Sequence, residues 1–176
     1  MRSARALALA VSLGAFSLAH SAAAEDPKVV RPAPSGADYS FKRQSMFGVL
    51  GAWSLASMGA GAGLALGGPN DFDRFMGIQG IAWGAINLAF TLWGEAQSRT
   101  NLFTTVDPKA EVIKKDSASL SRAFWINALL DVGYVLVGTV LWNIGGTEAI
   151  RGTGAGIVTQ GGFLFGFDTI GYMIFR

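Results

Sequence analysis

The chain has 176 residues, of which 51% are hydrophobic and only 15% are charged, and its formal net charge is +2 at pH 7. This composition is too apolar for an ordinary soluble domain and predicts an integral membrane protein. Cysteine is absent, and His20 is the single histidine. His20 belongs to an N-terminal segment, residues 1–24, that we expect to be cleaved off. The mature chain then has no familiar zinc site, no Ser-His or Cys-His nucleophile pair and no haem ligation by His or Cys.

Residues 1–24 have the pattern of a bacterial signal peptide. Arg2 and Arg5 precede an apolar run at 6–19, and the small residues at 21–24 offer a cleavage site. Removing two of the fourteen basic residues leaves twelve basic and twelve acidic ones. Because the remaining basic residues are dispersed, we expect no nucleic-acid partner. The alternative is an uncleaved N-terminal anchor, although the run is short for a span of about 20 residues.

After this segment, the chain divides into an arm and four apolar stretches. Residues 25–45 contain three of the five prolines and mixed charges, and we expect a Pro-rich flexible arm there. Each apolar stretch is close to the roughly 20 residues that a helix needs to cross a bilayer. The four predicted spans are 46–66, 75–93, 120–142 and 153–175.

The connections between the spans predict two helical hairpins. Turn residues at 67–71 and 143–152 make short links, whereas 95–119 is polar and contains Asp107-Pro108, which suits the cap and first residue of a short amphipathic surface helix. We therefore expect an all-α, four-transmembrane-helix bundle over 46–176. The competing fold is an eight-stranded barrel, which the long unbroken apolar runs disfavour.

The two hairpins also indicate an internal repeat. Gln79 is followed by glycine and, eight residues later, by Asn87, and Gln160 is followed in the same way by Asp168. Such units would be parallel repeats related by an axis along the membrane normal.

Polar side chains inside the spans are the candidates for a functional site. Asn127, Asp131 and Tyr134 lie within about 60° of one another around a helix. Counting about 1.5 Å per residue from the span ends brings Asn87 and Asp168 to the depth of Asn127.

An acidic side chain near the bilayer centre costs about 2.5–3.5 kcal/mol unless it faces protein or water. Both aspartates should therefore point inward. The resulting candidate cluster is Asp131, Asp168, Asn127, Asn87, Gln160 and Tyr134.

The cluster has two interpretations. Its groups either hydrogen-bond across helices and fix their register, or they bind a proton, a small cation or a small polar ligand. Small-xxx-small glycine pairs favour close helix association, within the bundle or with a homo-oligomer or another membrane protein. These pairs are Gly59/Gly63, Gly80/Gly84, Gly152/Gly156 and Gly162/Gly166.

Four stretches of the spans match a known pattern, namely GVLGAWSLASMGAGAG, FMGIQGIAWGAINLAF, INALLDVGYVLVG and GTGAGIVTQGGFLFGFD. Together they resemble an uncharacterised bacterial family of small four-helix membrane proteins. The resemblance implies the fold and no activity. The family usually has a histidine before the methionine that corresponds to Met76, and Asp73-Arg74-Phe75 lacks it.

These patterns predict a multi-pass protein of the bacterial inner membrane. We expect a non-enzymatic structural or interaction component of the envelope, without metal or cofactor. The alternative is a small transporter or a proton- or cation-coupled binding protein that uses Asp131 and Asp168. An enzyme is not expected, because the general acid-base candidates are two embedded acids with no evident nucleophile.

Two features of the sequence predict opposite orientations in the membrane. A cleaved signal peptide would place both ends of the mature chain and the 95–119 segment outside the cell. Most of the Lys and Arg residues belong to these parts, so the positive-inside rule favours the reverse.

Overall fold

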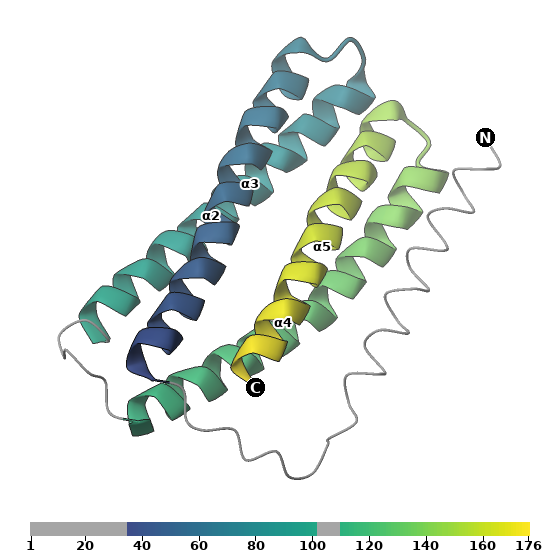
Figure 1. The fold of residues 1–176 in the computed structure, drawn as a ribbon. Helices are drawn as coiled ribbons and strands as arrows, with labels where there is room; N and C mark the ends of the chain where they lie inside the picture. Colours follow the sequence, from purple (N-terminus) through teal and green to yellow (C-terminus); the bar gives the residue numbers. More distant parts are fainter. Residues whose placement is uncertain (1–34, 102–109) are drawn as a thin grey trace.

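The computed structural model describes residues 35–101 and 110–176, and all regular elements in these ranges are α-helices (Figure 1). The predicted signal peptide and the Asp107-Pro108 cap lie outside the described residues. The helices are α2 (Gly36–Gly67), α3 (Asp71–Asn101), α4 (Ala110–Ile144) and α5 (Glu148–Phe175).

All four helices extend beyond the predicted spans, and the extensions of α2 and α4 change the predicted organisation of the chain. The side chain of Ser35 caps α2 by accepting a hydrogen bond from the Asp38 amide at 3.2 Å, so residues 36–45 are helical instead of belonging to a flexible arm. Helix α4 runs without a break from Ala110 to Ile144. The expected surface helix and the third span are therefore one element.

The length of α2 follows from a buried stripe that continues through the segment predicted to be an arm. Its members recur every three or four residues, as one face of a helix requires. They are Tyr39, Arg43, Met46, Leu50, Ser54, Ser57 and Gly61. The facing stripe of α3 has the same spacing and consists of Gly77, Gly80, Gly84, Asn87, Thr91 and Gly94.

Small residues let α2 and α3 pack backbone against backbone. A Cβ atom placed on Gly61 would lie 2.6 Å from the Gly77 carbonyl oxygen, and one on Gly84 would lie 2.8 Å from the Ser54 carbonyl oxygen. Side chains larger than glycine would separate the helices. Close backbone approach of this kind is a main source of helix association in lipid, where apolar surface gives little driving force.

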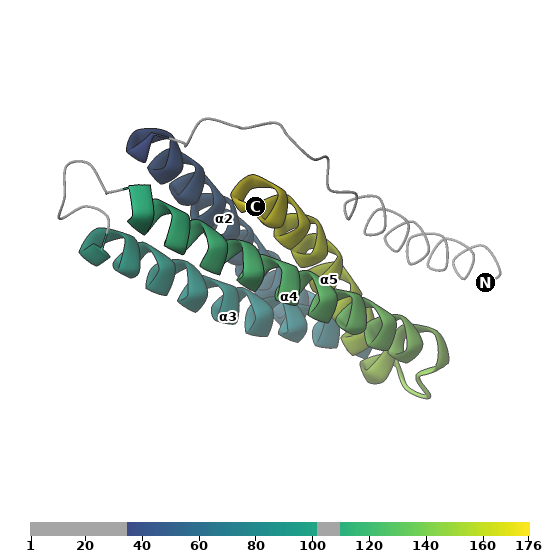
Figure 2. The same cartoon turned by 90° about the horizontal axis from the view of Figure 1, so that it is seen from below.

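The helices form two hairpins joined along one seam. Helix α2 packs on α3 and α4 packs on α5, while α3 and α5 connect the hairpins. The backbone of α2 approaches α4 and α5 only briefly, and the described backbones of α3 and α4 do not approach each other closely. The views from the side and from below show the paired hairpins and the start of α4 crossing toward the first turns of α2 (Figure 1, Figure 2).

Of the four predicted glycine pairs, two lie at helix interfaces. Gly80/Gly84 faces α2, and Gly152/Gly156 faces Phe72 and Gln79 of α3. The pairs Gly59/Gly63 and Gly162/Gly166 have nothing within 4 Å of the position that a Cβ would occupy. The spacing alone does not separate these two groups.

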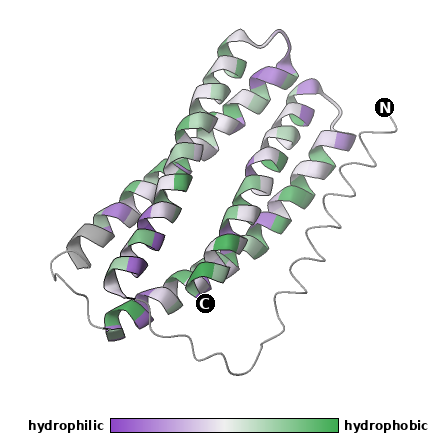
Figure 3. Cartoon of the chain, in the orientation of Figure 1, coloured by the Kyte–Doolittle hydropathy of each residue, from purple (hydrophilic) through white to green (hydrophobic). Residues whose placement is uncertain are grey.

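Three of the helices, α2, α3 and α4, are long and apolar enough to cross a membrane. Hydrophilic residues gather mainly toward the ends of the helices (Figure 3). Helix α5 is 28 residues long, enough for a crossing at about 1.5 Å per residue, but glycines and polar residues interrupt its apolar sequence. Many of these interrupting residues, among them Gln160 and Asp168, are buried against the other helices.

Candidate functional site: a cleft between α3 and α4

Because the backbones of α3 and α4 do not approach each other closely, a cleft of about 660 Å³ lies between these helices. Residues of α3 and α4 form its two walls, and parts of α2 and α5 close it from behind. Most of its lining is apolar, with six phenylalanine and tryptophan side chains from all four helices. These are Phe47, Trp83, Phe90, Trp93, Phe124 and Phe167.

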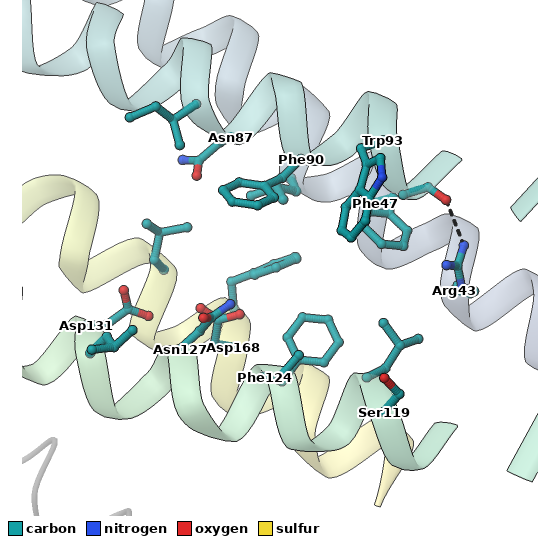
Figure 4. Close-up of a pocket in the computed structure, with 18 of the residues that line it drawn as sticks. Arg43, Phe47, Asn87, Phe90, Trp93, Ser119, Phe124, Asn127, Asp131 and Asp168 are labelled. Atoms are coloured by element: carbon teal, nitrogen blue, oxygen red, sulfur yellow. Dashed lines mark hydrogen bonds between the residues drawn. The ribbon is translucent and has the colours of Figure 1, made fainter. Parts of the chain in front are cut away.

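Polar side chains gather at one level of this cleft. Asn87 of α3 points across it toward Asn127 and Asp131 of α4 and Asp168 of α5 (Figure 4). Asn87, Asp131 and Asp168 are only 5%, 3% and 5% exposed. Tyr134 also lines the cleft. Five of the six predicted site residues thus lie around one cavity.

The polar groups at this level are incompletely paired within the chain. The carboxyl groups of Asp131 and Asp168 interact directly with each other. The Oδ2 atom of Asp131 and the Nδ2 atom of Asn87 are buried without a hydrogen-bond partner among the described residues. Burying such atoms unpaired costs about 1–3 kcal/mol each. The cleft therefore offers one acceptor and one donor to a ligand or to water.

An aromatic pair between α3 and α4 closes the cleft beyond the acids. The rings of Trp83 and Tyr134 meet edge to face, with centroids 5.0 Å apart. On the far side of this pair lies a second cavity of about 500 Å³ that also touches Trp83, Leu130 and Tyr134. The aromatic pair thus divides the space between α3 and α4 into two compartments.

An ion pair limits the cleft at its other end. Arg43 of α2 is 4% exposed; its Nε atom donates to Asp116 of α4 at 3.2 Å and its Nη1 atom to the Gly94 carbonyl of α3 at 3.0 Å. The Tyr39 hydroxyl also donates to Asp116, and the guanidinium lies 5.0 Å from the centre of the Phe47 ring. This cluster ties three helices together.

Sequence reasoning missed the Arg43 cluster because residues 25–45 were read from their composition. The signal was present in the spacing of Tyr39, Arg43, Met46 and Leu50, which continues the buried stripe of α2. The aromatic walls were missed because single Trp and Phe residues in spans are usual packing residues.

Gln160 does not belong to the cleft. Its Oε1 atom accepts from Trp53 Nε1 at 2.9 Å, and its Nε2 atom donates to Ser57 Oγ at 3.1 Å. The ring of Trp53 stacks on Phe163 with centroids 3.9 Å apart. Gln160 thus links α5 to α2, on another side of α5 from Asp168. Its contacts fit the interpretation as interhelical hydrogen bonding.

Comparison with known proteins identifies a family for the chain but no individual relative. No curated protein and no solved structure matches it. A family of unknown function, DUF6992, matches residues 49–169. The matched range includes the glycines that pack between α2 and α3 and the polar level of the cleft, but excludes Arg43. The chain is therefore a member of the family of unknown function DUF6992.

Proposed function

We propose that the protein is a membrane-embedded binding protein whose cleft between α3 and α4 takes an organic cation with an apolar body. The observation that carries this proposal is the convergence of Asn87, Asp131 and Asp168 from three different helices on one cavity, with two buried polar atoms left unpaired. In this proposal α5 is the fourth span of a multi-pass protein of the bacterial inner membrane.

The lining of the cleft supports a positively charged ligand. Asp131 and Asp168 are its buried acids, and the basic side chain that lines it, Arg43, is already paired with Asp116 at the far end. Aromatic faces such as those of Trp83 and Phe90 also attract cations. A volume of about 660 Å³ suits a small organic molecule and is more than a bare inorganic ion needs.

The acid pair supports exchange of the cation against a proton. Two carboxylates in direct contact repel each other when both are ionised, and one shared proton turns the repulsion into a hydrogen bond. A cation that binds beside the Asp131 carboxylate supplies a positive charge there, so the shared proton leaves. One positive charge enters and one departs, so the net charge of the acid pair with its bound cation or proton stays at −1.

The proposal predicts that tetraphenylphosphonium, a lipophilic aromatic cation, binds the purified chain and releases protons into a weakly buffered solution. Asp131→Asn and Asp168→Asn should each weaken binding at least tenfold, which corresponds to about 1.4 kcal/mol. The measurement is equilibrium dialysis of the labelled cation together with a pH-indicator dye.

Asp71→Asn is the matched control, because Asp71 is exposed in the first turn of α3, away from the cleft. All variants should retain the wild-type elution volume in detergent. Equal binding of neutral tetraphenylmethane, or unchanged binding in both cleft variants, would refute the cation site.

A second candidate function, an interaction component of the envelope, is supported by a different observation. The Gly59/Gly63 pair of α2 lies open, and an open small-xxx-small pair suits close packing of a further helix. A second copy of the chain or another membrane protein could supply it.

This second function predicts that Gly59→Leu/Gly63→Leu reduces self-association in bilayers at least fivefold, or about 1 kcal/mol. Gly133→Leu on α4, also an open position, should leave it unchanged. Energy transfer between labelled copies in vesicles measures the association. A wild-type chain that stays monomeric at all protein-to-lipid ratios would leave no role for this pair in self-association.

A further inference from the structure

A second hollow, separate from the cleft, lies where the start of α4 meets the end of α5. Its volume is about 730 Å³, and it shares no lining residue with the cleft. The side chains that matter for its chemistry are Glu111, Lys114, Arg122, Trp125, Tyr172 and Arg176.

The hollow has an excess of positive side chains. Lys114, Arg122 and Arg176 line it together with one acidic residue, Glu111. Lys114 and Arg122 are exposed, and neither has an ion-pair or hydrogen-bond partner among the described residues. They are eight residues apart on α4, so they lie on one side of the helix, about 12 Å apart along its axis.

The wall beside these cations is aromatic and apolar. The rings of Trp125 and Tyr172 have centroids 5.3 Å apart, and the Arg176 guanidinium lies 6.0 Å from the Tyr172 ring centre. Phe175 is 4% exposed and stacks on Phe124. Ser117 Oγ donates to the Phe175 carbonyl at 2.7 Å, which fixes the end of α5 against α4.

With α4 and α5 as spans, as in the proposed function, these residues lie at the edge of the hydrocarbon. Trp and Tyr concentrate where membrane spans meet the headgroups. Arg122 is about one turn outward from Trp125, and Lys114 is about two further turns out. The apolar wall therefore lies at acyl-chain level and the cations at headgroup level.

We propose that this hollow binds the headgroup of an anionic phospholipid of the surrounding bilayer, with the phosphate against Lys114 and Arg122 and an acyl chain along Trp125 and Tyr172. Basic side chains next to spans attract anionic lipids. The apolar wall distinguishes a lipid from a free anion, because a soluble phosphate would gain nothing from the two rings.

The test uses the full chain in vesicles of phosphatidylcholine with 20% phosphatidylglycerol and a trace of spin-labelled lipid. Spin-labelled phosphatidylglycerol should associate with the wild type at least threefold more strongly than spin-labelled phosphatidylcholine. Lys114→Gln/Arg122→Gln should remove this preference.

Lys42→Gln/Lys115→Gln is the matched control. It removes two positive charges at the same end of the bundle from residues that do not line the hollow, and the preference should persist. If both double variants lost the preference for phosphatidylglycerol equally, the preference would come from the general surface charge, and the site would be overturned. Displacement of the labelled lipid by 10 mM inorganic phosphate would also overturn it, because the site would then recognise a soluble anion.

Discussion

Replacing Gly61 with alanine should lower the free energy of unfolding by about 2 kcal/mol or more. A Cβ atom at this position would lie 2.6 Å from the Gly77 carbonyl oxygen and 2.8 Å from the Ile81 amide nitrogen. Both are backbone atoms of α3, so no side chain can turn away, and the helices must move apart. The loss of close packing along α2 and α3 follows from this movement.

Gly59→Ala is the control, since it adds the same methyl group to the same helix at a position with nothing within 4 Å. Its free energy of unfolding should stay within about 0.5 kcal/mol of the wild type. Unfolding by a denaturing detergent in mixed micelles, followed by tryptophan fluorescence, measures both variants. Equal stability of the two would show that α2 and α3 are not in tight contact at Gly61.

Removing Asp116 alone should destabilise the chain by about 2–4 kcal/mol, because the buried Arg43 loses its counter-ion. The side chain of Asp116 is 29% exposed, which places the effect below the upper limit for a fully buried pair. Asp116→Leu is the single variant, and Arg43→Met/Asp116→Leu removes both charges. The double variant should recover at least half of the loss.

The exposed pair Lys42 and Asp38, 2.8 Å apart on the first turns of α2, provides the comparison. Lys42→Met/Asp38→Leu and its single variants should change stability by no more than about 0.5 kcal/mol. The same detergent titration, arranged as a double-mutant cycle, gives the coupling energy of each pair. A coupling at Arg43 as small as that at Lys42 would remove the role assigned to the cluster.

The sequence predicted the helices well because an apolar stretch of about 20 residues is a local signal for a membrane-spanning helix. It failed at residues 36–45, where prolines nearby and mixed charges suggested an arm, although Tyr39 and Arg43 continue the spacing of the buried face. At these residues the composition indicates a flexible arm, whereas the spacing of the buried residues indicates a helix, and the structure has a helix. The charged side chain of Arg43 is stable on the buried face because Asp116 pairs with it. Asp116 lies 73 residues further along the chain, on another helix, so the local sequence does not reveal the pair.

The candidate cluster was predicted by depth, which explains both the success and the failure. Depth counting brought Asn87, Asn127, Asp131 and Asp168 to one region, and they line one cleft. Gln160 lies eight residues before Asp168, which places it about 12 Å away along the helix axis and turns its side chain about 80° around the helix. It therefore meets Trp53 of α2 instead.

The internal repeat stays a prediction. The two hairpins have the same layout, with each pair of helices in antiparallel contact. Their matched positions nevertheless have different surroundings: Gln160 bonds to α2, whereas Gln79 lines the second compartment beside Trp83. The side chains at equivalent places in a repeat need not keep the same partners once each hairpin packs against the other.

The interrupted sequence of α5 has a consequence for how the chain is made. Several glycines, Gln160 and Asp168 are buried in the finished bundle. With α5 as the proposed fourth span, a nascent α5 leaving the insertion machinery would expose them to lipid, where a central acid alone costs about 2.5–3.5 kcal/mol. Helix α4 emerges first, and its Gly138 and Asp131 face the glycines of α5. Biogenesis should therefore proceed by joint entry of α4 and α5 as a hairpin, with the earlier helix acting as the template for the later one.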